Sequence, residues 1–224
     1  MTAERFTGSF TQQEPIPEEG IAAALEVLRH GRLHRYNTAP GEVAETALLV
    51  VDMLNAYRHP DAEQLADNVA AIVDPLSSLI DEARQREDVD LIYVNDNYGD
   101  FTAEPSDLVR TALQGARPDL VRPIAPEPDS RVLTKVRHSA FYATPLAYLL
   151  NRLETARVIL TGQVTEQCIL YSALDAYVRH YPVVVPPDAV AHIDAELGRA
   201  ALAMMERNMS ARIAAAEKCL SESV

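Results

Sequence analysis

Three residues of different chemistry, Asp52, Lys135 and Cys168, each follow a short apolar run in this sequence. Asp52 and Lys135 come directly after such runs, whereas Cys168 comes after a run and a short turn led by glycine. A thiol can attack a carbonyl carbon, an ammonium can stabilise the thiolate, and a carboxylate can carry the proton. The three residues are therefore candidates for nucleophilic catalysis.

Each of the three residues also has a purely structural interpretation. Asp52 could cap a helix, Lys135 could be a solvated surface charge, and Cys168, followed by Ile169 and Leu170, could pack in a core. Their placement at one edge of one sheet favours catalysis over these alternatives. The second cysteine, Cys219, falls in a helix expected over 214–221, and we interpret it as structural.

The local context of Cys168 also favours a nucleophile. It opens a helix expected over 166–180, where the positive end of the helix dipole lowers the pKa of a thiol. Unpaired backbone N–H groups at such a position can bind an oxyanion. With Lys135 nearby, we expect a Cys168 thiol with a lowered pKa.

The apolar runs alternate with amphipathic stretches along the chain. The runs are rich in β-branched residues and show no polar alternation, which is typical of strands covered on both faces. This order predicts an α/β fold, a three-layer α/β/α sandwich with a mostly parallel central sheet and ligands at the carboxyl ends of its strands. We expect strands at 47–51, 91–94, 131–134, 158–160 and 183–185, helices near 64–87, 106–115, 144–153, 166–180 and 194–214, and a surface loop over 118–128.

The chain of 224 residues divides into an arm and a domain. Residues 1–45 are expected to form an N-terminal arm with one helix over 18–30, and residues 46–224 to form one catalytic domain. A net charge of −13 argues against a nucleic-acid partner, and no apolar run is long enough for a membrane helix. Two cysteines and a polar N-terminus without a signal-peptide pattern predict a cytoplasmic location.

Several segments give the sequence a family resemblance that runs from about Thr46 to Met209. In order and spacing they resemble the isochorismatase-like cysteine hydrolases, a family with a Rossmann-like fold whose members form dimers or tetramers. The arm is therefore expected to contact a second subunit in a homodimer or homotetramer. The matching residues are Leu48 through Asn55, Tyr93 through Asp96, Lys135 with Ser139-Ala140-Phe141, and Gly162 through Cys168.

The resemblance implies a set of roles for the candidate residues. Asp52, Lys135 and Cys168 correspond to the catalytic triad of the family. The resemblance also implies a non-proline cis peptide between Gln163 and Val164, and an oxyanion site formed by the backbone amides of Val164 and Cys168.

The implied activity is hydrolysis of a C–N bond in a small amide, carbamoyl or ureido substrate through a thioester. The presence of Cys168 favours this activity over isochorismatase-type vinyl-ether hydrolysis, in which Asp52 would act as the acid. Nicotinamidases of the family bind a metal through an Asp-x-His pair near the second strand, but residues 95–99 here contain no histidine. We therefore expect no metal and no cofactor. A non-catalytic α/β binding protein that uses the same cleft is the remaining alternative.

Several side chains near the expected strand ends are candidates for contact with a small-molecule substrate, although each could equally serve in packing. Arg137 could pair with a substrate carboxylate or lie at the surface, and His138 is expected to be a pocket wall or surface residue rather than a metal ligand. The substrate-contact candidates are Asn55, Tyr57, Asn95, Phe101 and Tyr142.

Overall fold

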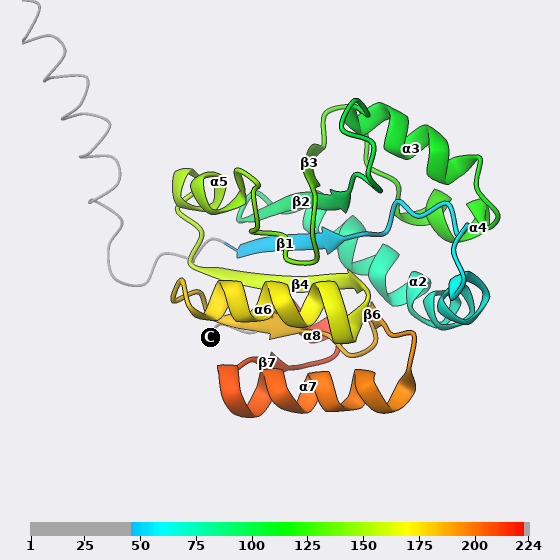
Figure 1. Ribbon diagram of the computed structural model, residues 1–224. Coiled ribbons are helices and arrows are strands. Elements are labelled where there is room, and N and C mark those ends of the chain that lie inside the picture. The colour runs from blue at the N-terminus through cyan, green and yellow to red at the C-terminus, as the bar shows by residue number, and fades with distance from the viewer. Residues whose placement is uncertain (1–45, 222–224) are drawn as a thin grey trace, which may run out of the picture. The chain divides into compact units, whose positions relative to one another are not determined.

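The computed structural model describes residues 46–221, which form a seven-stranded sheet between layers of helices (Figure 1). All strand pairs are parallel. The strand order is β3-β2-β1-β4-β5-β7, with β6 beside β4. The strands are β1 (Thr46–Val51), β2 (Val89–Asp96), β3 (Arg131–Lys135), β4 (Arg157–Gln163), β5 (Val183–Val185), β6 (Val190–Ala191) and β7 (Arg212–Ile213).

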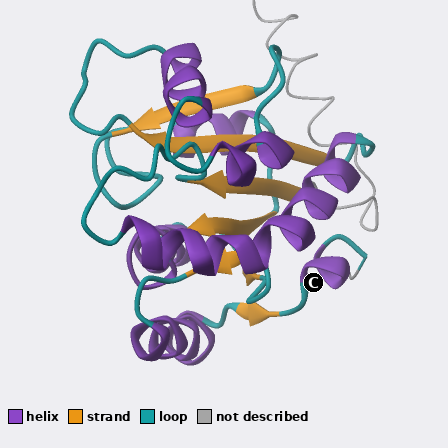
Figure 2. Cartoon of the chain, turned by 90° about the vertical axis from the view of Figure 1, so that its right-hand side faces the viewer, coloured by secondary structure: helices purple, strands orange, loops and turns teal. Residues whose placement is uncertain are grey.

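Helices cover both faces of the sheet, as the two views in Figures 1 and 2 show. Along β1, Leu48 and Val50 pack in the core on the α2 side, whereas Leu49 and Val51 pack in the core on the side of α5, α6 and α7. The predicted three-layer α/β/α sandwich is thus confirmed. The helices are α2 (Ala62–Arg84), α3 (Pro105–Leu113), α4 (Pro118–Val121), α5 (Leu146–Arg152), α6 (Leu170–Tyr177), α7 (Ala195–Met209) and α8 (Ala216–Cys219), with a 3₁₀ turn η1 (Arg122–Ile124) and a π-helical turn η2 (Thr165–Ile169).

The strand order reverses direction between β1 and β4. The chain runs outward from β1 through β2 to β3, and then returns to place β4 on the other side of β1. Connections that leave the ends of two such strands in opposite directions open a crevice there, where ligands of open α/β sheets bind. Asp52 follows β1 and the turn that contains Cys168 follows β4, so both flank this crevice.

The structure corrects some details of the expected elements. The stretch 118–128 is not only a surface loop. It contains α4 and η1, which bury Leu120, Val121 and Ile124 in the core on the α2 side of the sheet. The two-residue strands β6 and β7 were not anticipated. The N-terminal arm and its expected helix lie outside the described residues. Within 46–221, no helix is both long and apolar enough to span a membrane.

Candidate active site

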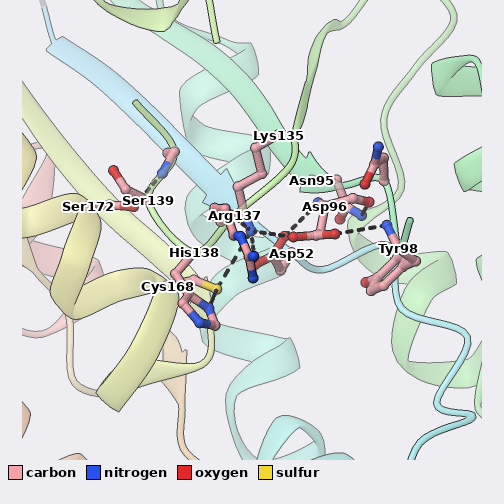
Figure 3. A network of polar contacts seen from close by, with 12 residues as sticks. Asp52, Asn95, Asp96, Tyr98, Lys135, Arg137, His138, Ser139, Cys168 and Ser172 are labelled. Atoms are coloured by element: carbon pink, nitrogen blue, oxygen red, sulfur yellow. Dashed lines mark hydrogen bonds and ion pairs between the residues drawn. The ribbon is translucent and has the colours of Figure 1, made fainter. Parts of the chain in front are cut away.

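Lys135 lies at the centre of a buried polar cluster at the carboxyl edge of the sheet (Figure 3). Its side chain is fully buried, and its Nζ atom lies 2.8 Å from Oδ2 of Asp52 and 3.2 Å from Oδ2 of Asp96. The same Nζ atom lies 3.6 Å from the Cys168 sulfur. The carboxylate, the ammonium and the thiol singled out in the sequence therefore meet in one place, and Lys135 is not a surface charge.

Asp52 is held in a left-handed backbone conformation, with a φ of 55° directly after β1. Aspartate tolerates this conformation better than most residues. Its carboxylate Oδ1 accepts a hydrogen bond from the Asp96 amide at 2.7 Å, and its backbone carbonyl accepts one from Gln163 Nε2 at 2.6 Å. One carboxylate oxygen is thus occupied by a backbone amide, while the other faces Lys135.

The turn between β4 and Cys168 depends on Gly162. This residue has a φ of +106°, and a Cβ atom built on it would lie 2.1 Å from the carbonyl oxygen of Val51 in the neighbouring strand. Only glycine fits there without displacing β1. The peptide bond between Gln163 and Val164 is cis, at the position where the family resemblance implies one.

Cys168 lies inside the π-helical turn η2, which occurs in proteins mainly as a single turn and often at functional sites. The amides of Gln167 and Ile169 donate to the Val164 carbonyl and close the turn. The sulfur is nearly buried and interacts with the Val164 backbone N–H. The Val164 amide therefore points toward the nucleophile, which suits a donor to an oxyanion.

The pKa of the Cys168 thiol is raised, whereas the sequence led us to expect a lowered one. Burial, and then the negative charge of Asp52, raise the pKa of the Cys168 thiol well above its usual range, and Lys135 offsets this only in part. The helix start and the lysine were expected to lower this pKa, but burial and the neighbouring carboxylate outweigh them. The thiol therefore rests protonated beside the ion pair.

Burial and neighbouring charges also shift the pKa values of the ion pair between Asp52 and Lys135. Burial raises the pKa of Asp52, against the lowering effect of Lys135. Burial alone would lower the pKa of Lys135, but the charge of Asp52 and its hydrogen bond to the ammonium oppose this effect, and the pKa of Lys135 is raised. Lys135 therefore stays charged, and the raised pKa of Asp52 equips its carboxylate to accept and hold a proton.

A cavity of about 380 Å³ opens onto the thiol. Asp52, Val164 and Cys168 line it, together with Asn55, the one predicted substrate contact that does so. The other lining residues were not predicted to contact the substrate. They are His59, Asp61, Leu65, Asp96, Tyr98, Gln163, Gln167 and Ile193.

The structure places the other four predicted substrate contacts elsewhere. Tyr57 is buried and lines a neighbouring cavity of about 540 Å³. The side-chain oxygen of Asn95 accepts a hydrogen bond from the Leu54 amide at 2.9 Å, so it supports the loop after β1. Phe101 and Tyr142 are exposed by 81% and 58%, and neither is among the residues that line the cavity at the thiol.

Asp96 belongs to the site, although we predicted a site role for its neighbour Asn95 instead. Neighbouring residues of a strand point to opposite faces, so only one of Asn95 and Asp96 can approach Lys135. Asp96 pairs in register with Lys135 across β2 and β3. The alternation of side chains along the strand is therefore the feature that distinguishes Asp96 from Asn95.

Within the described chain, no group of three or more His, Cys, Asp or Glu side chains is arranged to hold a metal ion. The cation that the cluster does contain is Lys135, whose charge is already shared by Asp52 and Asp96. The arrangement can thus move a proton between sulfur and carboxylate next to a fixed positive charge. That the protein uses no metal remains a prediction.

Comparison with known proteins agrees with this geometry. The isochorismatase domain model matches residues 46–218. The chain is 36% identical over 179 residues to the uncharacterized isochorismatase family protein YaaI of Bacillus subtilis, covering 80% of this chain and 98% of that protein. It is 29% identical over 152 residues to the maleamate amidohydrolase of Pseudomonas putida, covering 64% and 71% of the two chains. The solved structure of N-carbamoylsarcosine amidase from Thermoplasma acidophilum superposes with a TM-score of 0.61 at 25% identity, over 79% of this chain and 99% of that one.

Proposed function

This chain belongs to the isochorismatase family of hydrolases, and on that premise we propose that it cleaves a C–N bond of a small amide, carbamoyl or ureido substrate through a thioester on Cys168. The observation that carries the proposal is the position of Lys135 Nζ, 2.8 Å from Asp52 and 3.6 Å from the sulfur. Similar proteins named as a maleamate amidohydrolase and an N-carbamoylsarcosine amidase support the amide class.

The first half-reaction forms the thioester. Asp52 accepts the thiol proton, and the sulfur of Cys168 attacks the substrate carbonyl carbon while Lys135 stays charged beside it. The backbone amides of Val164 and Cys168 hold the oxyanion of the tetrahedral intermediate. When the C–N bond breaks, the proton on Asp52 passes to the leaving nitrogen, which departs as ammonia or an amine.

The second half-reaction releases the acid. Asp52, again ionised, takes a proton from a water molecule in the cavity, and the resulting hydroxide attacks the thioester carbonyl. The C–S bond then breaks, and the proton on Asp52 returns to the sulfur. The cycle restores the thiol and the carboxylate with one water consumed.

Vinyl-ether hydrolysis is a second candidate, because a proton donor must be protonated in the resting site and burial raises the pKa of Asp52. In that reaction Asp52 would protonate the substrate, and Cys168 would take no part. The two candidates therefore differ in their need for the thiol.

The test measures ammonia release from a panel of small amides, carbamoyl compounds and ureido acids, and keto-acid release from isochorismate, which contains no nitrogen. Cys168→Ala is compared with Cys219→Ala, whose sulfur lies in α8 and donates to the Ala215 carbonyl at 3.4 Å. We expect the Cys168 variant to lose at least about a thousandfold in rate and the Cys219 variant to keep its activity. Acid quenching during turnover should trap a mass increase equal to the acyl group on the peptide that contains Cys168. Normal amide turnover by Cys168→Ala, or cleavage of isochorismate by that variant, would refute the thioester scheme.

A further inference from the structure

The segment that follows Lys135 turns back over the thiol and is held at both ends (Figure 3). On one side, Lys135 Nζ donates to the Arg137 carbonyl at 3.1 Å. On the other side, the Ser139 hydroxyl donates to Asp175 of α6 at 2.5 Å, and the Ala140 amide donates to the Ser172 hydroxyl at 2.9 Å. The backbone of His138 lies between these two anchors, so its position is determined by both.

The His138 imidazole lies next to the reacting sulfur. Its Nδ1 atom is 3.8 Å from the Cys168 sulfur, within the range of hydrogen bonds to sulfur. Its ring packs against Tyr171, with the ring centroids 5.5 Å apart and a 40° angle between the planes. The sulfur therefore has two side-chain nitrogen neighbours, the fully buried Lys135 and the exposed His138.

Lys135 alone supports a thiolate poorly, because its charge is already shared. Two carboxylates lie within 3.2 Å of its Nζ atom, which is closer than the sulfur at 3.6 Å. When Asp52 holds the thiol proton, Asp96 still shares the charge of Lys135. A donor in addition to Lys135 and the Val164 amide would therefore stabilise the buried thiolate, since N–H groups hold an ionised acceptor more strongly than a neutral one.

We propose that His138 is a further catalytic residue of this hydrolase, whose Nδ1–H group donates a hydrogen bond to the Cys168 thiolate while Asp52 holds the thiol proton. No proton moves to or from His138 in the cycle. The inference rests on the proposed function, because the thiolate exists only if Cys168 is the nucleophile. The exposed His138 thus gives the sulfur a second side-chain donor besides Lys135.

The surroundings of His138 come from several elements of the fold. The charged and titratable groups around it are Cys168, Tyr171 and Asp175 from the turn and helix after β4, Lys135 and Arg137 from its own segment, and Asp52 and Asp96 behind Lys135.

The experiment follows alkylation of Cys168 by iodoacetamide across pH in the Cys219→Ala background, so that no substrate need be known. His138→Leu removes the donor, His138→Gln retains an N–H, and His180→Asn is the matched control at an exposed histidine beyond α6. We expect alkylation of His138→Leu to be slowed about tenfold, which is about 1.4 kcal/mol. His138→Gln should recover part of the rate, and His180→Asn should match the parent.

Two results would overturn the inference. One is an unchanged alkylation rate in His138→Leu at every pH, and the other is equal slowing in the Leu and Gln variants, which would show a packing role. The outcome stays separate from that of the proposed function, since turnover by Cys168→Ala refutes both proposals. Inactive Cys168→Ala together with a normal alkylation rate in His138→Leu refutes only this one.

Discussion

At the scale of single residues, Asp52 influences the Cys168 sulfur in two opposing ways. In the proposed reaction its carboxylate accepts the thiol proton. In the resting site its negative charge, after burial, is a main cause of the raised pKa of the thiol. In the proposed reaction, the same residue therefore raises the pKa of the resting thiol and also removes its proton.

Replacing Asp52 with asparagine should separate these two effects. Removal of the negative charge lowers the pKa of the Cys168 thiol and leaves Asp96 as the one carboxylate paired with Lys135 in the site, so alkylation by iodoacetamide should become faster at neutral pH. Hydrolysis should fall by at least about a thousandfold, because the proton acceptor is lost. The measurement pairs alkylation rate with amide turnover, in the Cys219→Ala background. Slower alkylation in Asp52→Asn would contradict the assigned cause of the raised pKa.

The three central site residues could be predicted from the sequence because each follows an apolar run, and parallel strands bring their carboxyl ends to one edge. The thiol pKa could not, because burial of Cys168 depends on α6 and the sheet together. Phe101 follows β2 closely in sequence, yet its loop carries it into solvent. Nearness in sequence to a strand end locates a backbone but not the direction of a side chain.

At the scale of elements, the close approach of β1 and the turn after β4 depends on a single glycine. Gly162→Ala would place a Cβ atom 2.1 Å from the Val51 carbonyl oxygen and also impose a positive φ on alanine. We expect it to lower the free energy of unfolding by about 3 kcal/mol or more. Gly99→Ala is the matched control, since Gly99 has a φ of +84° but nothing within 4 Å of the added Cβ, and should cost about 1 to 2 kcal/mol. Equal losses for the two variants in urea unfolding would contradict this account.

The main elements were predictable because their patterns are long. The β-branched runs marked β1 to β5, and the apolar spacing marked α2 and α7, which lie within the expected ranges or a few residues beyond them. The strands β6 and β7 have two residues each and no pattern to detect. Proline in the stretch 118–128 suggested a loop, but Pro118 begins α4, where a missing amide costs nothing.

At the scale of the whole molecule, the N-terminal arm is predicted to join subunits. The prediction rests on the family resemblance and on the amphipathic pattern over 18–30, since residues 1–45 lie outside the described structure. Sedimentation of the intact chain should give a dimer or tetramer of the 24.6 kDa subunit. A single species with the mass of one subunit, at concentrations used for catalysis, would contradict it.

The position of β3 at an edge of the sheet determines how the active site responds to local unfolding. Lys135 ends β3, an edge strand that is hydrogen-bonded only to β2 among the residues 46–221. Its Val132, Leu133 and Thr134 are partly exposed. Amide hydrogens of such a strand exchange through local fraying well before the interior strands open. Each fraying event would withdraw the lysine and leave two adjacent carboxylates without a counter-ion. Mild denaturant should therefore abolish hydrolysis at concentrations at which the helices on both faces of the sheet are still folded.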